Sequence, residues 1–352
     1  MPRLPPSLLR KAYRTSPHIR TLLPATRDIA SAAHELRWIR EHVRDHPAPS
    51  QRLARLCRRR GRGEPLQYIL GTQPFGRLEI QCRPGVLVPR PETEALAVHL
   101  EGLLRRGALP LSRRDGLRIV DLCTGTGCIA LSLFAGLQEA VPRLLVRGVD
   151  VSPVAVALAR ANLRRNVGEG RLRAAATAEQ SVDFVLGDVF DAATVETLAR
   201  GGGPWDVLVA NPPYVSRDVW AAGRGQMGYS VRKYEPRLAL VPGDDVPAYE
   251  GCAHEDVFYA RLLIVAVALG VRVVLFELGD EGQAARVLRL VRRREALRGA
   301  ACEVWRDWPD VAPQEDEARV MSVGEDGDDE IQVAIRGSGN VRSVLVQIPE
   351  HS

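Results

Sequence analysis

Short apolar runs alternate with helical stretches from Leu117 onward, and this alternation restricts the fold more than any other feature of the chain. The runs are "LRIVD", "LLVRGVD", "VDFVLGD", "WDVLVAN" and "VRVVLFELG". Strands that are buried on both faces of a sheet read as near-continuous Val, Ile and Leu, as these do. Alternating strands and helices are typical of a doubly wound parallel sheet. The sequence therefore predicts an α/β fold for this part of the chain.

Two further apolar runs near the end of the chain, "CEVWRDW" and "VRSVLVQI", predict two late strands. The expected sheet therefore has seven strands, most of them parallel. Residues 312–339 between them are acidic and contain few apolar residues. We interpret this stretch as an insertion that forms a loop or a loose hairpin. Its acidic residues are Glu315, Asp316, Glu317, Glu325, Asp326, Asp328, Asp329 and Glu330.

The residue pattern in the first part of the chain, up to about Gly63, predicts a small helical domain. "IASAAHELRWIREHV" places apolar residues at helical spacing, and the glycines of "RRRGRG" end the segment. The arginine run from Arg58 to Arg62 is either a solvated face or a docking surface. The basic leader before Asp28, rich in Ser and Thr, fits a mitochondrial transit peptide or an ordinary basic helix equally well.

Composition narrows the classes of function. No apolar stretch approaches the roughly 18 residues of a membrane span, so none is expected. The formal charge of +5 allows an RNA-rich partner without requiring one. None of the six cysteines pairs at the two-residue spacing of a zinc or redox motif, which predicts reduced thiols and no metal site.

A glycine-rich turn follows the first predicted strand in "VDLCTGTGCIALSL". Glycines allow a sharp turn between strand and helix and a close approach of backbone to a ligand. The spacing is neither G-x-G-x-x-G nor that of a P-loop. The candidate cofactor-binding residues here are Asp121, Cys123, Thr124, Gly125, Thr126 and Gly127.

Acidic residues also end the next two predicted strands. Asp150 follows Gly127 by about 20 residues, the spacing at which a carboxylate can accept hydrogen bonds from ribose hydroxyls. Asp188, in "VLGDVF", could reach the adenine amine, and Val189 beside it and Asn211 further along are the remaining candidate cofactor-binding residues. Three acidic strand tips would repel a pyrophosphate, so the pattern favours S-adenosylmethionine over NAD.

The fourth predicted strand ends in Asn211, Pro212, Pro213 and Tyr214. The prolines fix the backbone, so their carbonyls are rigid acceptors, and the Asn211 side chain adds another. Two acceptors can hold both hydrogens of a planar NH2 group and aim its nitrogen at a methyl donor, while Tyr214 stacks on the flat group. The four residues are therefore the candidate catalytic and substrate-binding turn.

These motifs together resemble the HemK/PrmC family, the release factor glutamine methyltransferases. "NPPY" after "D-x-x-T-G-T-G" is joined by "GEPLQYILG", "VLVPRPETE" and "YEPRLAL", and the resemblance runs from Gly63 to about Asp310. It implies a helical domain over 1–68, a linking β-hairpin over 69–92, and a Rossmann-like methyltransferase domain over 93–352. The N-terminal "LRWIREHV" with its basic leader suggests the fungal mitochondrial branch.

The resemblance also implies the chemistry. The expected reaction is S-adenosylmethionine-dependent N5-methylation of the glutamine in the GGQ motif of a class I peptide chain release factor. It implies a protein partner with no direct requirement for nucleic acid, in the mitochondrial matrix, or in the cytoplasm if the chain is bacterial. The segment from Cys123 to Gly127 matches the cofactor loop, Asp150 the ribose acid, and the segment from Asn211 to Tyr214 the glutamine-binding turn.

Two positions depart from the family pattern. Cys123 stands where glycine is usual, and Val189 stands where bacterial members often carry tryptophan, which leaves the adenine contacts open. Arg90 and Glu92 match a family motif and either bind the substrate or form an ion pair that holds the hairpin.

Two alternatives remain from the sequence. A DNA or RNA methyltransferase acting on an exocyclic amine could use the same turn. A non-catalytic assembly factor with a methyltransferase fold is the other.

Overall fold

The computed structural model describes residues 3–45, 52–111, 116–173, 179–200, 202–222, 227–324 and 330–350. The chain divides into two compact units. Unit 1 comprises Met1–Gln73, Gln81–Val88 and Asp218–Arg237, and unit 2 comprises Pro74–Ile80, Pro89–Arg217 and Leu238–Ser352. A separate two-stranded sheet pairs β1 (Thr72–Phe75) with β2 (Leu78–Gln81). No helix of the described part is long and apolar enough to cross a membrane.

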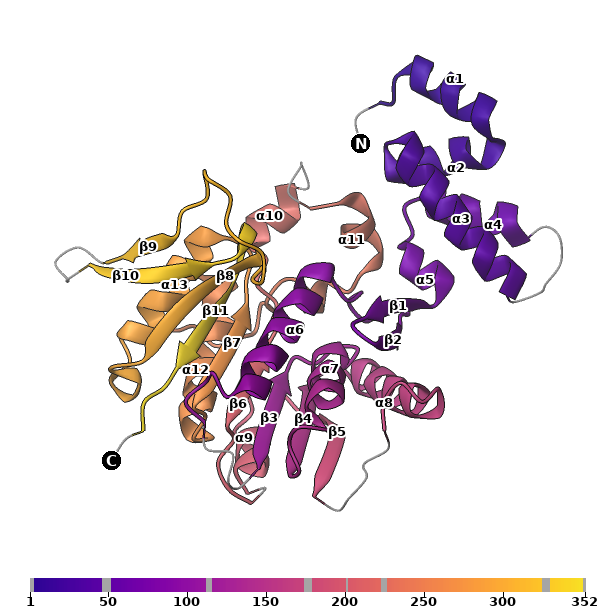
Figure 1. The fold of residues 1–352 in the computed structure, drawn as a ribbon. Coiled ribbons are helices and arrows are strands. Elements are labelled where there is room, and N and C mark those ends of the chain that lie inside the picture. Colours follow the sequence, from indigo (N-terminus) through magenta and orange to yellow (C-terminus); the bar gives the residue numbers. More distant parts are fainter. Residues whose placement is uncertain are drawn as a thin grey trace. The chain divides into compact units, whose positions relative to one another are not determined.

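Unit 1 is a helical bundle that contains the N-terminal helices of the chain (Figure 1). Its helices are α1 (Pro6–Thr15), α2 (Pro17–Thr26), α3 (Ile29–Asp45), α4 (Arg52–Gly61), α5 (Leu66–Leu70), α10 (Arg217–Ala222) and α11 (Tyr229–Tyr234). Leu22, Leu36 and Ile39 are among the buried residues that pack α2, α3 and α4 together. A Cβ at Gly61 would lie 2.1 Å from the Thr21 carbonyl oxygen, so glycine permits this close helix contact.

A distant segment of the sequence completes unit 1. The Tyr234 hydroxyl donates to the Arg62 carbonyl at 3.2 Å, and the Val88 amide donates to Glu235 Oε2 at 3.0 Å. The Tyr68 hydroxyl donates to the Val86 carbonyl at 2.7 Å. The motifs "PLQYIL", "VLVP" and "YEPR" therefore meet in one unit, although they are far apart in the sequence.

The arginine run of unit 1 is only partly exposed. Arg59 forms an ion pair with Glu64, and Arg60 forms one with Glu35 at 2.7 Å. Arg58 and Arg62 are exposed. If the run is a docking surface rather than a solvated face, Arg58 and Arg62 are therefore the two arginines of the run that can contact a partner.

Unit 2 is built on a nine-stranded sheet within the described residues, in the order β5-β4-β3-β6-β7-β11-β8-β10-β9. The strands are β3 (Leu117–Leu122), β4 (Leu144–Asp150), β5 (Gln180–Leu186), β6 (Val207–Ala210), β7 (Val273–Glu277), β8 (Ala301–Trp308), β9 (Val320–Val323), β10 (Ile331–Arg336) and β11 (Ser338–Gln347). Neighbouring strands from β5 to β7 are parallel, and β11 is antiparallel to both β7 and β8. The expected α/β class with a mostly parallel sheet is confirmed.

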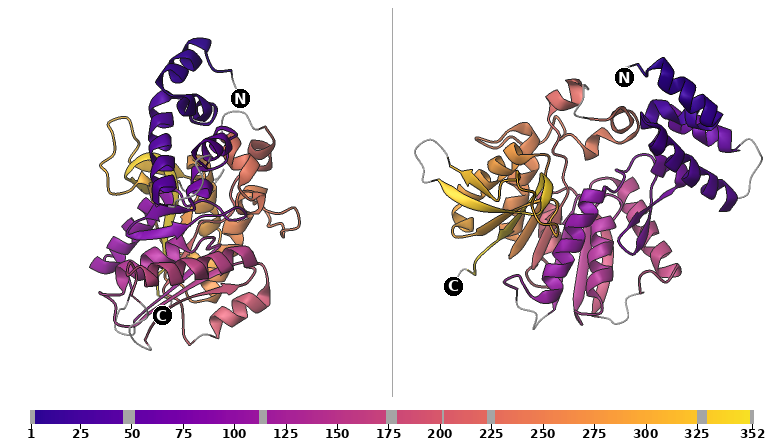
Figure 2. Two further views of the ribbon diagram at one scale, coloured as in Figure 1. Left: turned by 90° about the vertical axis from the view of Figure 1, so that its right-hand side faces the viewer. Right: turned by 45° about the horizontal axis from the view of Figure 1, so that its top comes forward.

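Two layers of helices enclose this sheet (Figures 1 and 2). The layers are α6 (Pro91–Arg106), α7 (Cys128–Leu137) and α8 (Pro153–Gly168) on one face, and α9 (Ala192–Ala199), α12 (Val257–Ala268) and α13 (Glu281–Arg292) on the other. Short 3₁₀ helices lie at Arg237–Ala239, His254–Asp256 and Glu295–Leu297. Successive strand residues point to opposite faces. Accordingly, Leu275 packs in the α6–α8 core, while Phe276 packs in the α9–α13 core.

The sheet has nine strands rather than seven, because β9 and β10 come from the acidic stretch 312–339. The stretch does form a hairpin, since β10 pairs antiparallel with β9, but the hairpin is not loose, because β10 also pairs with β8 and so joins the main sheet. Met321, Val323, Val333 and Ile335 are buried in the main core, at every second position of the two strands. An edge strand needs apolar residues on one face only, so a low apolar content does not exclude it. Glu325, Asp326, Asp328 and Asp329 lie outside the described residues.

Candidate functional site

The turn between β3 and α7 begins with a buried carboxylate. Asp121 is fully buried, and its Oδ2 accepts from Thr124 Oγ1 at 2.6 Å and from the Ala130 amide at 3.2 Å. Its Oδ1 is buried with no hydrogen-bond partner among the described residues. Burial raises the pKa of Asp121 to about 7. An unpaired buried carboxylate oxygen is costly, so this atom is a candidate acceptor for a bound polar or cationic group.

The backbone of the same turn enters the left-handed region at three positions. The φ angles are +64° at Cys123, +56° at Gly125 and +78° at Gly127. A Cβ at Gly127 would lie 2.9 Å from both Ala159 Cβ and the Phe184 ring, so glycine is required there. Cys123 adopts a backbone conformation that glycine adopts without strain. A cysteine in place of the family's glycine therefore carries a local strain energy of about 1–2 kcal/mol.

We expect Cys123→Gly to raise the free energy of unfolding by about 1 kcal/mol, because relief of this strain exceeds the greater chain entropy of glycine. Urea unfolding followed by circular dichroism measures the change. Cys302→Gly is the matched control, since β8 places no left-handed backbone there. That control should lower the free energy of unfolding, and a similar loss in Cys123→Gly would contradict the assignment of strain.

Asp150 ends β4 beside this turn. Its Oδ2 accepts from the Gly125 amide at 2.8 Å, and its Oδ1 accepts from the Ser152 amide at 2.9 Å. Ser152 caps α8 through a hydrogen bond from the Ala155 amide to its side chain, with Pro153 next in the helix. Burial raises the pKa of Asp150, while the two amides oppose that rise. The carboxylate is thus fixed at the carboxyl edge of the sheet.

We expect Asp150→Ala to weaken the binding of S-adenosylmethionine by roughly 1.5–3 kcal/mol, the usual contribution of hydrogen bonds to a charged group. Isothermal titration calorimetry measures the change. Asp183→Ala is the matched control, because Asp183 pairs with Arg147 within the neighbouring strands. Unchanged affinity in Asp150→Ala would place the ribose contact elsewhere.

The structure separates the two residues expected near the adenine. Asp188 is exposed, and its Oδ1 accepts from the Phe190 amide at 2.9 Å. Val189 is buried in the core that α12 covers, so its side chain is not available at the edge. The sequence reading missed Val151 and Leu186, which are 48% and 60% exposed at the ends of β4 and β5. Apolar residues exposed at strand ends offer a flat group a surface that Val189 does not.

These features together fit a nucleoside-containing cofactor. The turn has three left-handed residues, Asp150 is held at its side, and Asp121 retains an unpaired oxygen. Within the described residues no group of three His, Cys, Asp or Glu side chains is placed to hold a metal ion.

Asn211 follows β6 directly and lies next to the turn between β3 and α7, because Ala210 pairs with Leu122 at the ends of their strands. Asn211 Nδ2 donates to Thr93 Oγ1 at 3.3 Å. This contact engages the NH2 end of the amide, so the acceptor atom Oδ1 is directed away from Thr93. Pro212 and Pro213 are buried, which holds their carbonyls rigidly in the turn.

Tyr214 is held by two neighbours, Gln283 and Arg342. Its carbonyl accepts from Gln283 Nε2 at 3.2 Å, and Gln283 also donates to Asp256 Oδ1 at 2.8 Å. Arg342 hydrogen-bonds to the Tyr214 side chain, and burial raises the pKa of that phenol well above its usual range. The ring is therefore a neutral surface whose position is set by α13 and β11.

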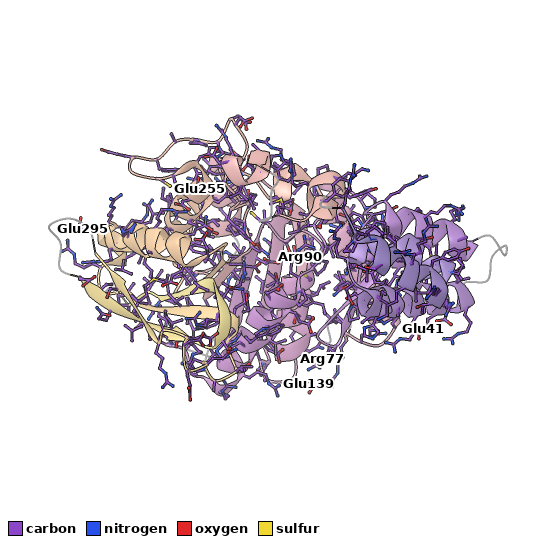
Figure 3. The ribbon with its side chains drawn as sticks, turned by 90° about the horizontal axis from the view of Figure 1, so that it is seen from above. Glu41, Arg77, Arg90, Glu139, Glu255 and Glu295 are labelled. Carbon is purple, nitrogen blue, oxygen red and sulfur yellow. The ribbon has the colours of Figure 1, made fainter. Side chains whose placement is uncertain are left out.

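Arg90 and Glu92 stand at the start of α6, and Arg90, labelled in Figure 3, immediately precedes it. The charges of both residues act on the buried Glu277 at the end of β7. Glu277 accepts a hydrogen bond from Thr93 Oγ1 at 2.6 Å. Thr93 and Glu277 were missed from the sequence, although both lie inside motifs that it singled out, "VLVPRPETE" and "VRVVLFELG".

Comparison with known proteins identifies the family of the chain. No family model matches the chain. A probable mitochondrial MRF1 N5-glutamine methyltransferase of Schizosaccharomyces pombe is 39% identical over 246 residues, which cover 68% of this chain and 73% of the relative. The chain belongs to the N5-glutamine methyltransferase family. The mitochondrial MRF1 N5-glutamine methyltransferase of Saccharomyces cerevisiae is 35% identical, covering 68% of each chain.

Bacterial relatives extend the comparison. A release factor glutamine methyltransferase of Chlorobaculum tepidum is 36% identical and covers 56% of this chain and 59% of its own length. Among solved structures, the catalytic domain of human METTL16 with a MAT2A 3'UTR hairpin aligns at 15% identity and a TM-score of 0.46, covering 83% of this chain and 80% of that one. The N5-glutamine methyltransferases use S-adenosylmethionine, so family membership confirms the expected enzyme class and methyl donor. The nucleic acid methyltransferase alternative is not favoured.

Proposed function

We propose that this protein methylates the side-chain nitrogen of the glutamine in the GGQ loop of a mitochondrial class I release factor. The observation that carries the proposal is the rigid Asn211–Tyr214 turn beside the left-handed turn that follows β3. Two fungal relatives are named as mitochondrial enzymes acting on MRF1, and the protein is mitochondrial as they are.

In this proposal the turn after β3 and the acidic strand ends hold the cofactor, which supplies an electrophilic methyl group on a sulfonium. Asp150, fixed by the Gly125 and Ser152 amides, accepts from the ribose hydroxyls. The unpaired Oδ1 of Asp121 is the acceptor for the cationic end of the amino acid part. Val151 and Leu186 supply apolar surface for the base.

The glutamine amide is held by Asn211 Oδ1 and the Pro212 carbonyl, one acceptor for each N–H. An amide nitrogen is a weak nucleophile because its lone pair is delocalised. Holding it in near-attack geometry supplies much of the barrier reduction, and the two acceptors stabilise the positive charge that develops on the nitrogen. The neutral Tyr214 ring packs on the planar group. The chain needs no nucleophilic side chain of its own for this reaction.

Unit 1 is proposed to bind the body of the release factor. It offers Arg58 and Arg62 as exposed cations, together with the exposed aromatic side chains of Tyr13 and Trp38. Aromatic and arginine side chains are enriched at protein interfaces, which supports a protein partner for this surface.

The direct test offers the enzyme both substrate classes at once. The protein is incubated with S-adenosylmethionine carrying a labelled methyl group, a mitochondrial class I release factor and total RNA. Label on the release factor, located to the GGQ glutamine by mass spectrometry, is the expected result. Label on the RNA alone would replace the proposal with the nucleic acid alternative.

A further inference from the structure

A buried carboxylate lies behind the catalytic amide and takes no part in the mechanism above. Glu277 ends β7 and is 5% exposed. In the parallel pairing of β6 with β7, Ala210 is opposite Phe276, so the next residues along, Asn211 and Glu277, leave the sheet side by side. Carboxylates are seldom buried without a partner, because the loss of hydration is expensive. The position of Glu277 therefore calls for an explanation.

Strand alternation places both side chains on one face. Val209 and Leu275 pack against the α6–α8 core, whereas Ala210 and Phe276 pack against the opposite core. Asn211 and Glu277, two positions after Val209 and Leu275, therefore point toward the helix layer that contains α6. Thr93 is buried in the first turn of α6 and is 4% exposed.

One hydroxyl joins the two side chains. Thr93 Oγ1 donates to Glu277 Oε2 at 2.6 Å and accepts from Asn211 Nδ2 at 3.3 Å. A hydroxyl has a single hydrogen. While Glu277 holds that hydrogen, only the oxygen lone pairs of Thr93 face Asn211, and they select its NH2 end. The Asn211 oxygen is then turned away from Thr93, as an acceptor role toward the substrate requires.

We propose that Thr93 and Glu277 are positioning residues that fix the orientation of the Asn211 amide for methyl transfer, and that this function requires Glu277 to be ionised. The proposal rests on the methyl transfer proposed above. It also gives Thr93, within the motif "VLVPRPETE", a role: Thr93 sets the direction of the hydrogen bonds, whereas Arg90 and Glu92 act on the charge of Glu277.

The surroundings of Glu277 allow its charge to change near neutral pH. Burial raises its pKa to about 7, against the hydrogen bond from Thr93 and the positive charges of Arg342 and Arg90. A protonated Glu277 can itself donate to Thr93 and release the threonine hydrogen toward Asn211, which would favour the reversed amide. The charged and titratable groups that act on it are Arg90 and Glu92 from α6, Cys128 from α7, Tyr214 after β6, Tyr259 from α12 and Arg342 from β11.

The first test removes the hydroxyl. Thr93→Val keeps the shape of the side chain but cannot accept from Asn211, and we expect kcat to fall about tenfold, the rate equivalent of one hydrogen bond. Affinity for S-adenosylmethionine, measured by calorimetry, should be unchanged, and Thr93→Ser should restore most of kcat. A Thr93→Val enzyme with the wild-type kcat would overturn the proposal, as would a Thr93→Ser enzyme no faster than Thr93→Val.

The second test reads the charge. At saturating cofactor and substrate, the wild-type kcat should fall as the pH is lowered through about 7. Glu277→Gln has no charge to lose, so its kcat should be lower at high pH and should not show this fall. Glu101→Gln on α6 is the matched control and should keep the wild-type profile, because the Glu101 side chain is also largely buried, at 14% exposed, but pairs with Arg105 rather than with Thr93. A low-pH fall that persists in Glu277→Gln belongs to another group, such as Asp121, and overturns the proposal.

The readout is methyl transfer to whichever substrate the wild-type enzyme labels. If that substrate is RNA, the proposed function fails, yet the effects of Thr93→Val and Glu277→Gln on kcat still decide the role of the two residues. Thermal unfolding of each variant is measured alongside. If Thr93→Val does not fold, the pH profile of Glu277→Gln alone confirms or overturns the proposal.

Discussion

Replacing Asn211 with alanine should reduce methyl transfer by about 10²-fold or more, the usual effect of removing one positioned polar contact from a transition state. Alanine takes away the side-chain acceptor that holds one N–H of the substrate amide. It also removes the NH2 group that donates to Thr93, whose hydroxyl still donates to Glu277. The binding of S-adenosylmethionine should change little, because the contacts that we propose for the cofactor come from the turn after β3 and from Asp150, which the Gly125 amide holds in place.

The measurement is single-turnover methylation of the release factor at saturating cofactor, with cofactor affinity determined separately by calorimetry. Asn211→Asp serves as a graded control, since a carboxylate of the same reach still accepts from the substrate N–H groups but cannot donate to Thr93. Its rate of methyl transfer should lie between those of the wild type and Asn211→Ala. Full activity in Asn211→Ala would exclude the proposed mechanism.

The sequence predicted the parts of the site that lie at the ends of strands. Asp121, Asp150 and Asn211 each end or follow a run of buried Val, Ile and Leu, and the structure places all three at the carboxyl edge of one sheet. The helix cap at Ser152 was also predictable from the sequence, because a serine followed by proline is a local signal for the start of a helix. Local patterns of this kind need no knowledge of tertiary contacts.

The missed residues depend on contacts between distant segments. Thr93 and Glu277 are 184 positions apart and meet only because α6 covers the face of the sheet toward which Glu277 points. The alternation along "VVLFE" does predict the face of the sheet on which Glu277 lies, because it places Glu277 on the same face as Leu275. Nothing in the sequence alone indicates which helix would lie over that face.

Val189 is a second residue whose surroundings depend on tertiary packing. It follows "GD", where bacterial members often carry tryptophan, and the sequence left the adenine contacts open; the structure buries its side chain in the core behind the sheet. The packing of residues 227–237 with the N-terminal helices likewise depends on contacts such as that of Tyr234 with Arg62, for which the sequence carries no local signal.

A release factor whose GGQ loop is changed to GGE should be rejected by about 10⁴-fold, the second large effect that we expect. The acceptors around Asn211 are suited to a group that donates two N–H hydrogens. A carboxylate donates none and places negative charge against the Asn211 and Pro212 oxygens. Sites that are built to hydrogen-bond a substrate group reject an analogue lacking it by 10⁴–10⁵-fold, because their own polar atoms are left unpaired.

The same reasoning separates the protein substrate from a nucleic acid. A glutamine on a loop can enter a narrow pocket between two rigid acceptors, whereas a base requires a wider slot and must first be unstacked. Mass spectrometry of the release factor and of its Gln→Glu variant, after incubation with enzyme and cofactor, measures the discrimination. A methyl group on the variant would show that recognition does not depend on the N–H donors, and an unmodified wild-type loop would show that the substrate is another molecule with a planar NH2 group.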